Sequence, residues 1–388
     1  MRRARASGSC GYVSGAVFDG HALLDDRALV VAGGAVVGLV APDDLTPDVE
    51  RRDLGPGVIA PGFVDLQVNG GGGLMFNDAP SVETLEAMAA AHARLGATSI
   101  LPTLITDTPD KTDRAIEAVR GAVGLGVPGL MGLHLEGPHL ARSRKGAHDA
   151  NLIRPMENAD LKVLQDVASL LPCLLVTLAP EAATLAQIAA LSEAGVIVCL
   201  GHTDASYDDC VAAQRAGAYG VTHLFNAMRQ TGPRDPGVVG AALTLGGLSA
   251  GLIADGIHVH PANIAMALRA KVGPGRVFLV SDAMATAGSD IASFRLNGRE
   301  ITRTDGRLTL ADGTLAGADL SLAQAVSVMT GHVGLPLESA LAMATAVPAD
   351  FAGFGHLRGR LAPGRAADFV HLGADGALNA VWQGGRAL

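Results

Sequence analysis

The sequence lacks several features that would place it in a familiar class. No apolar run approaches the roughly 18 residues that a membrane-spanning helix needs, although the mean hydropathy is +0.32. No G-x-G-x-x-G opens a helix after a strand, so a dinucleotide-binding sheet has no support. The four cysteines are scattered and form no C-x-x-C pair. We therefore expect reduced thiols and a cytoplasmic protein.

Charge is also scarce. Charged residues make up 17% of the 388 residues, the formal net charge is -9, and no basic patch or RNA-binding motif is visible. Nucleic acid is not an expected partner, and an anionic small substrate would need a local pocket of positive character. The basic start, Met1 to Arg5, is not followed by an apolar segment. We interpret it as a frayed start rather than a secretion signal.

The middle of the chain alternates apolar strands with helical patterns. The strands are near-continuous apolar runs, as in a parallel sheet that is covered on both faces. Strand candidates lie at 62–68, 98–105, 129–136, 174–178, 196–201, 220–225, 248–254 and 277–281. Helical patterns lie at 82–95, 111–123, 161–170, 181–194, 207–216 and 263–270. This order predicts an α/β fold with a (β/α)8 TIM-like barrel, and a doubly wound sheet is the alternative.

Both ends of the chain hold short β-like runs broken by Gly, Asp and Pro. We predict that residues 1–57 and 351–388 together build a small β-sandwich domain, while 58–350 form the barrel. A β-hairpin insertion is expected near 292–316, with turns at Asn297-Gly298 and Asp305-Gly306.

One stretch, from Met131 to Pro138, reads as a buried strand that ends on a carboxylate. Side chains alternate along a strand, so His134 and Glu136 point the same way. A carboxylate there must be ion-paired, metal-bound or catalytic, because an isolated buried charge is too costly.

Two histidines end the fifth and sixth predicted strands, His202 and His223. The active site of a parallel barrel lies at the carboxyl ends of its strands. One Glu and two His supply three ligands and leave a fourth position for water, which is the pattern of a catalytic zinc site. Cys199 is three residues before His202, so strand alternation excludes it as a ligand.

Asp282 ends the eighth predicted strand. It could cap the following segment, but a carboxylate beside a metal-activated water can act as its general base. We favour the general base.

Four motifs in this order carry a resemblance: His134-Leu135-Glu136-Gly137-Pro138, Gly201-His202-Thr203-Asp204-Ala205, Thr222-His223-Leu224-Phe225-Asn226-Ala227-Met228 and Ser281-Asp282-Ala283-Met284. The sequence resembles the N-acetylglucosamine-6-phosphate deacetylase family of the amidohydrolase superfamily. The resemblance implies metal ligands at Glu136, His202 and His223, and a catalytic acid and base at Asp282. It also implies residues that bind the substrate, its phosphate included, at His148, Asn226, Ala227, Arg234 and His258.

The sequence departs from the superfamily where many members carry H-x-H for a second metal. Here the positions are Gln67-Val68-Asn69. Amides are poor zinc ligands, so we predict a single divalent metal, with Zn²⁺ favoured and Fe²⁺, Mn²⁺ or Co²⁺ as alternatives. Gln67 and Asn69 then mark vacant second-metal positions or supporting residues, and His134 is expected to support the site from one layer below.

The expected reaction is hydrolysis of the N-acetyl group of N-acetyl-D-glucosamine 6-phosphate. The alternatives are a deacetylase of N-acetylgalactosamine 6-phosphate, another amidohydrolase acting on an N-acyl or cyclic amide, and a barrel that has lost catalysis. The resemblance also implies a homodimer. A phosphorylated amino sugar is the expected partner, and neither nucleic acid nor a membrane is.

Overall fold

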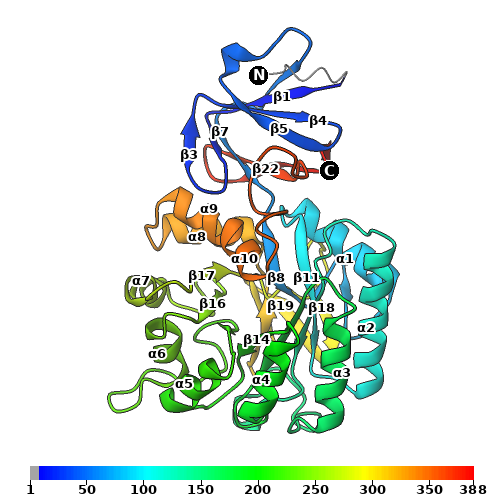
Figure 1. Cartoon of the computed structure of the whole chain (residues 1–388), viewed down its shortest axis with the longest axis vertical. Helices are drawn as coiled ribbons and strands as arrows, with labels where there is room; N and C mark the ends of the chain where they lie inside the picture. The colour runs from blue at the N-terminus through cyan, green and yellow to red at the C-terminus, as the bar shows by residue number, and fades with distance from the viewer. Residues whose placement is uncertain (1–7) are drawn as a thin grey trace.

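A parallel eight-stranded sheet curls into a nearly closed barrel at the centre of the structure, a computed structural model that describes residues 8–388 (Figure 1). Its strands neighbour one another in chain order: β8 (Val64–Val68), β11 (Ser99–Ile105), β12 (Leu133–Glu136), β13 (Leu174–Leu178), β14 (Ile197–Leu200), β15 (Gly220–Val221), β16 (Ser249–Leu252) and β17 (Val277–Leu279). A doubly wound sheet reverses its strand order at a switch point, and this sheet does not. The predicted (β/α)8 barrel is confirmed, and the alternative is wrong.

The barrel closes between β8 and the segment that follows β17. The N–H of Asp282 donates to the carbonyl of Gln67 at 3.0 Å, and the N–H of Asn69 donates to the carbonyl of Ala283 at 2.8 Å. Val68 also bridges to Ala283 in parallel. Residues that close the barrel are therefore also predicted site residues.

Helices cover the outside of the barrel. They are α1 (Val82–Arg94), α2 (Pro109–Gly124), α3 (Asn158–Ala168), α4 (Leu185–Glu193), α5 (Tyr207–Arg215), α6 (Gly237–Thr244), α7 (Pro261–Ala270), α8 (Leu322–Gly331) and α9 (Leu337–Ala344). Several begin at a hydroxyl that accepts a backbone N–H, as Ser81 does for α1 and Thr184 for α4. The residues that the structure describes contain no helix that is both long and apolar enough to cross a membrane.

Helix α6 was not predicted from the sequence. Its segment contains Gly237 and Gly240, which lower helix propensity. Most of its residues are buried, so it has no polar face that would produce a 3.6-residue period.

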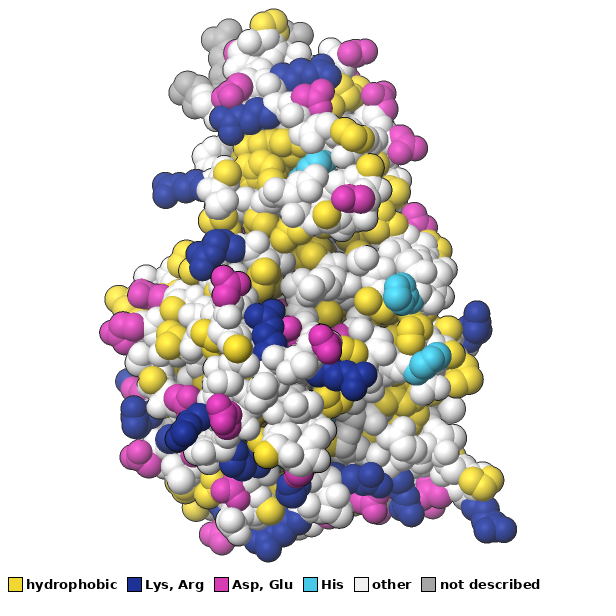
Figure 2. Space-filling model, turned by 180° about the vertical axis from the view of Figure 1, so that it is seen from behind, with side chains coloured by type: hydrophobic (Ala, Val, Ile, Leu, Met, Phe, Trp, Pro, Cys, Tyr) yellow, Lys and Arg dark blue, Asp and Glu magenta, His cyan; other side chains and the backbone are white. Residues whose placement is uncertain are grey.

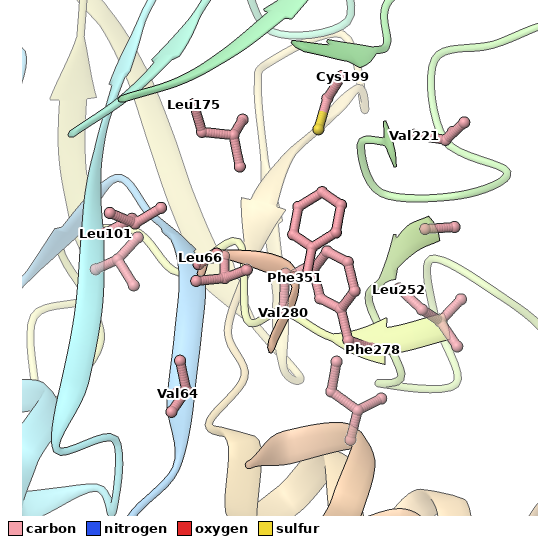
Figure 3. Packing of buried hydrophobic residues seen from close by; sticks show 14 of the residues in the cluster. Val64, Leu66, Leu101, Leu175, Cys199, Val221, Leu252, Phe278, Val280 and Phe351 are labelled. Atoms are coloured by element: carbon pink, nitrogen blue, oxygen red, sulfur yellow. The ribbon is translucent and has the colours of Figure 1, made fainter. Parts of the chain in front are cut away.

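Apolar side chains fill the barrel, as Figure 3 shows for residues from several strands. At the end where the strands begin, Phe351 of α10 (Ala346–Phe351) packs against Phe278 and Tyr219, with ring centroids 4.8 and 5.1 Å away. Cys199 lies in this same core (Figure 3). Its thiol is therefore part of the packing.

Both chain ends build the small β domain above the barrel (Figure 1). One sheet orders β5 (Ala35–Val40), β4 (Ala28–Ala32), β1 (Cys10–Val13) and β6 (Glu50–Asp53). The other orders β24 (Arg386–Ala387), β23 (Leu378–Gln383), β22 (Phe369–Gly373), β7 (Gly57–Pro61), β2 (Ala16–Phe18) and β3 (Leu23–Asp25). The antiparallel pairing of β22 with β7 joins the two ends, so the predicted domain is confirmed. Its exact boundaries stay a prediction, and Met1 to Arg5 lie outside the described residues.

The predicted insertion is a four-stranded antiparallel sheet rather than a simple hairpin. Its strands are β18 (Ser293–Leu296), β19 (Arg299–Thr304), β20 (Arg307–Thr309) and β21 (Leu315–Ala318). The last strand bridges back to the barrel through Ala318 and Ala283. The insertion is therefore anchored one residue after Asp282. A short hairpin of β9 (Gly70–Gly71) and β10 (Leu74–Met75) follows β8.

Charged side chains of both signs are interspersed over the face that Figure 2 shows, and apolar side chains gather on the small β domain. This face gives no support to a nucleic-acid partner, which would need a concentrated basic surface.

Candidate active site

Glu136, His202 and His223 converge at the carboxyl ends of β12, β14 and β15. Glu136 Oε1 lies 3.2 Å from His202 Nε2 and 3.0 Å from His223 Nε2. The two Nε2 atoms are 3.0 Å apart. All three side chains are almost completely buried. Three residues far apart in sequence thus present one ligand atom each to a common point.

This donor set fits a metal ion. Tetrahedral zinc with bonds of about 2.0–2.2 Å keeps its ligand atoms about 3.4 Å apart, close to the observed triangle. His202 Nδ1 lies 2.8 Å from the carbonyl of Arg144, to which it can only donate. That bond leaves the lone pair of Nε2 directed at the cluster, as a metal ligand requires.

The electrostatics of the cluster reflect burial and close contact. Burial opposes ionisation of Glu136, but its close contacts with His202 and His223 outweigh that effect and hold the pKa of Glu136 well below its usual range. Burial lowers the pKa of His223, yet its hydrogen bond to Glu136 raises that pKa overall. The cluster therefore keeps a negative charge in contact with imidazoles, which suits a cation.

Asp282 lies beside this cluster and is held by two amides. Its Oδ1 accepts hydrogen bonds from Gln67 Nε2 at 3.1 Å and from Asn69 Nδ2 at 2.7 Å. Gln67 Nε2 also donates to Glu136 Oε1 at 3.2 Å. Burial, with repulsion from Glu136, raises the pKa of Asp282 to about 6. In this structure Gln67 and Asn69 thus direct amide donors at carboxylates instead of offering ligand atoms to a second metal.

Three of the converging residues have left-handed backbone conformations. The φ angles are 48° at His202, 30° at His223 and 51° at Asp282. Such conformations are rare outside glycine and cluster at functional sites. The left-handed conformation of His223 also explains why β15 ends earlier than the predicted strand 220–225.

His148 lies on the other side of Glu136. Its Nε2 is 3.8 Å from Glu136 Oε2, and its ring centroid is 4.3 Å from that of His202. Possible ligand atoms of Glu136, His148 and His202 all lie within 4.8 Å of one another. Burial holds the pKa of His148 well below its usual range. His148 is therefore a neutral imidazole next to the cluster.

Thr106 supports His148, and sequence reasoning missed it. Its Oγ1 lies 2.8 Å from His148 Nδ1 and donates to the carbonyl of Glu136 at 3.1 Å. Thr106 directly follows β11, and its position at a strand end is the signal that could have found it.

The other predicted substrate residues are His258, Asn226, Ala227 and Arg234. His258 Nδ1 donates a hydrogen bond to Asp255 Oδ2 at 2.6 Å, and Asp255 also accepts the backbone N–H of His258 at 2.8 Å. Asn226 and Ala227 lie three and four residues after His223, and the N–H of Asn226 donates to the carbonyl of His223 at 2.9 Å. Arg234 is exposed in the segment before α6.

His134 lies in the barrel interior, one layer below Glu136 on the same strand. Its Nδ1 is 3.2 Å from Thr103 Oγ1, and its Nε2 is 2.8 Å from Thr177 Oγ1. Burial lowers the pKa of His134 to about 4. It is a neutral residue of the barrel interior, and each of its ring nitrogens is hydrogen-bonded to a threonine hydroxyl.

Comparison with known proteins agrees with this geometry. The family model described as Amidohydrolase family matches residues 58–388, and the one described as NagA composite domain matches 12–58. The chain is 40% identical over 370 residues to a Shewanella sp. (strain ANA-3) protein named N-acetylgalactosamine-6-phosphate deacetylase, covering 94% of this chain and 92% of that one. It is 32% identical over 357 residues to a Haemophilus influenzae protein named N-acetylglucosamine-6-phosphate deacetylase, covering 91% and 92%.

A solved structure gives the same picture. The crystal structure of N-acetylglucosamine-6-phosphate deacetylase from Pasteurella multocida superimposes with a TM-score of 0.93 at 34% identity, covering 98% of this chain and 99% of that one. The chain therefore belongs to the amidohydrolase family, together with these deacetylases.

Proposed function

We propose that this amidohydrolase removes the N-acetyl group of N-acetyl-D-glucosamine 6-phosphate and releases D-glucosamine 6-phosphate and acetate. The observation that carries the proposal is the convergence of Glu136, His202 and His223 within 3.2 Å of one another, next to an Asp282 that two amides orient. The names of the relatives supply the substrate class.

In this proposal one divalent cation, with Zn²⁺ favoured over Fe²⁺, Mn²⁺ or Co²⁺, is held by Glu136, His202 and His223. When bound, the cation polarises the acetyl carbonyl and lowers the pKa of a water molecule to about 7. The three proposed ligands are one carboxylate and two imidazoles, and this donor set accepts all four metals.

Asp282 moves the proton. Gln67 and Asn69 both bind its Oδ1, so Oδ2 is the oxygen left to accept a proton from the attacking water. Asp282 then returns this proton to the departing nitrogen, so that a C–N bond is replaced by a C–O bond. A carboxylate with a pKa of about 6 is suited to both transfers at neutral pH.

The remaining predicted residues bind the sugar phosphate in this proposal. His148 and His258 flank the reacting group, and the Asn226-Ala227 turn with Arg234 receives the phosphate dianion. We also propose a homodimer, which rests on family likeness alone, and a cytoplasmic location, which rests on the four free cysteines.

A second candidate substrate is N-acetylgalactosamine 6-phosphate. The Shewanella relative, at 40% identity, carries that name. The two sugars differ only in the configuration at C4, so the metal ligands and Asp282 would serve both.

The test is acetate release from N-acetylglucosamine 6-phosphate, N-acetylgalactosamine 6-phosphate and free N-acetylglucosamine. We expect the first to be hydrolysed fastest and the free sugar slowest. Asp282→Asn should lower kcat by about 10²–10⁴-fold while the metal content stays unchanged. Asp305→Asn is the matched control, because Asp305 is exposed and also has a left-handed φ of 49°. Full turnover by the Asp282 variant, or no acetate from either phosphorylated sugar, would refute the proposal.

A further inference from the structure

The turn between β18 and β19 of the inserted sheet contacts the segments that hold His148. Arg299 Nη2 donates to the carbonyl of Ala147, and Asn297 Nδ2 donates weakly to the carbonyl of Thr106 at 3.5 Å. Ala147 directly precedes His148, and Thr106 is its hydrogen-bond partner. The insertion therefore contacts the residue that precedes His148 and the residue that hydrogen-bonds to its ring.

The hydroxyl of Thr106 fixes which nitrogen of His148 carries the proton. Thr106 Oγ1 has one hydrogen, and that hydrogen goes to the carbonyl of Glu136 at 3.1 Å. Nδ1 of His148, 2.8 Å from this oxygen, must then be the donor. Nε2 is left unprotonated, 3.8 Å from Glu136 Oε2. A shift of the 145–148 segment would move this lone pair away from the reaction site.

The inserted sheet is firmly packed, so its turn is a rigid support. Leu296, Ile301 and Leu308 are fully buried in a cluster that also contains barrel residues such as Ile105 and Met284. Ala147 packs against the same cluster. Arg299 thus contacts the 145–148 segment from a sheet that is itself packed against the barrel.

We propose that Arg299 is a positioning residue for deacetylation, which holds the 145–148 segment so that Nε2 of His148 faces the metal-ligand cluster. This inference rests on the proposed function. Arg299 donates to a main-chain carbonyl, and its action on the reaction passes through His148.

The test compares Arg299→Met, Arg299→Lys and Arg295→Met in the metal-loaded enzyme. Arg299→Met removes a charged hydrogen-bond donor and should lower kcat about tenfold with little change in KM. Arg299→Lys keeps a charged donor and should recover part of that loss. Arg295 is exposed on the neighbouring strand and lies opposite Glu300, so Arg295→Met should leave kcat unchanged.

A double-mutant cycle with His148→Ala decides whether the effect passes through His148. If it does, Arg299→Met should cost little once His148 is gone, because coupled residues are not additive. Additive losses in the cycle, an effect on KM alone, or wild-type turnover by Arg299→Met would overturn the positioning role. Failure of the wild-type enzyme on all acetylated sugars would instead remove the proposed function, so the two outcomes are distinct.

Discussion

The side-chain amide of Asn69 donates a hydrogen bond to Oδ1 of Asp282 at 2.7 Å, across the seam where the barrel closes. The same seam brings the N–H of Asp282 to the carbonyl of Gln67. The first and last barrel strands therefore fix both the backbone and the carboxylate of Asp282. The residue pair at the positions where an H-x-H relative would hold a second metal here orients Asp282, the proposed general base.

Asn69→Leu tests this role. The change keeps the branched shape of the side chain but removes the donor, so Asp282 loses its shortest hydrogen bond in the buried site. We expect kcat to fall roughly tenfold, since a hydrogen bond to a charged group contributes about 1.5–3 kcal/mol. The metal content should not change, because Asn69 is not a proposed ligand. Steady-state kinetics with metal analysis checks both points, and loss of the metal would contradict them. Asn151→Leu, at an exposed position, is the control.

Metal binding should stabilise the fold. The three proposed ligand atoms lie at the carboxyl ends of β12, β14 and β15, so an ion that binds only the folded chain adds about 2.7 kcal/mol of stability at a hundredfold excess over Kd. We expect Zn²⁺ to raise the Tm of chelator-treated protein by several degrees, and His223→Ala to abolish that rise. His356→Ala, at an exposed histidine, should keep it. An equal Tm rise in the His223 variant would argue against His223 as a ligand.

Asp65 should make stability depend on pH. It is 1% exposed, and its Oδ1 accepts the N–H groups of Gln67 and Ser281 at 3.3 and 3.2 Å. Its Oδ2 has no hydrogen-bond partner among the described residues. Burial raises the pKa of Asp65 from 3.8 to about 7. Between these two pKa values the folded chain keeps a proton that the unfolded chain releases. The stabilisation that this proton gives the folded chain is complete below pH 4 and is lost as the pH rises to 7.

A pKa raised that far corresponds to about 4 kcal/mol across this window. Asp65→Asn cannot ionise and keeps an acceptor oxygen. Its free energy of unfolding in urea should therefore fall less than that of the wild type between pH 5 and pH 8. The comparison with the wild type cancels the other titrating groups, and Asp305→Asn serves as the control. Parallel pH profiles for wild type and Asp65→Asn would refute the assignment.

Thr177→Val should weaken the barrel interior without removing the metal site. Thr177 Oγ1 lies 2.8 Å from His134 Nε2 and 2.6 Å from Thr222 Oγ1, and Thr177 is fully buried. Valine has the same shape but leaves His134 Nε2 and Thr222 Oγ1 without this hydrogen-bond partner. This should lower the free energy of unfolding by about 1–3 kcal/mol. We expect a lower free energy of unfolding in denaturant and an unchanged Zn²⁺ affinity. Exposed Thr302→Val is the control; a matching loss there would exclude the hydrogen-bond explanation.

The fold was largely readable from the sequence because its signals are local. The apolar strands, the hydroxyl caps of helices and the Gly-containing turns each depend on residues within a few positions of one another. Helix α6 was missed for the same reason: Gly237 and Gly240 oppose a helix locally, and only burial against the barrel stabilises it. Predicted strand six was too long because the left-handed residue His223 ends it.

The sequence by itself determined the barrel, the shared β domain and the residue types that end the strands. Tertiary structure alone decided that Gln67 and Asn69 bind Asp282, that Thr106 fixes the proton of His148, and that Arg299 reaches Ala147 from 152 residues away in the chain. The physical reason is range. Side-chain period and turn chemistry act between near neighbours, whereas hydrogen bonds across the barrel seam and from the inserted sheet exist only after packing has brought distant segments together.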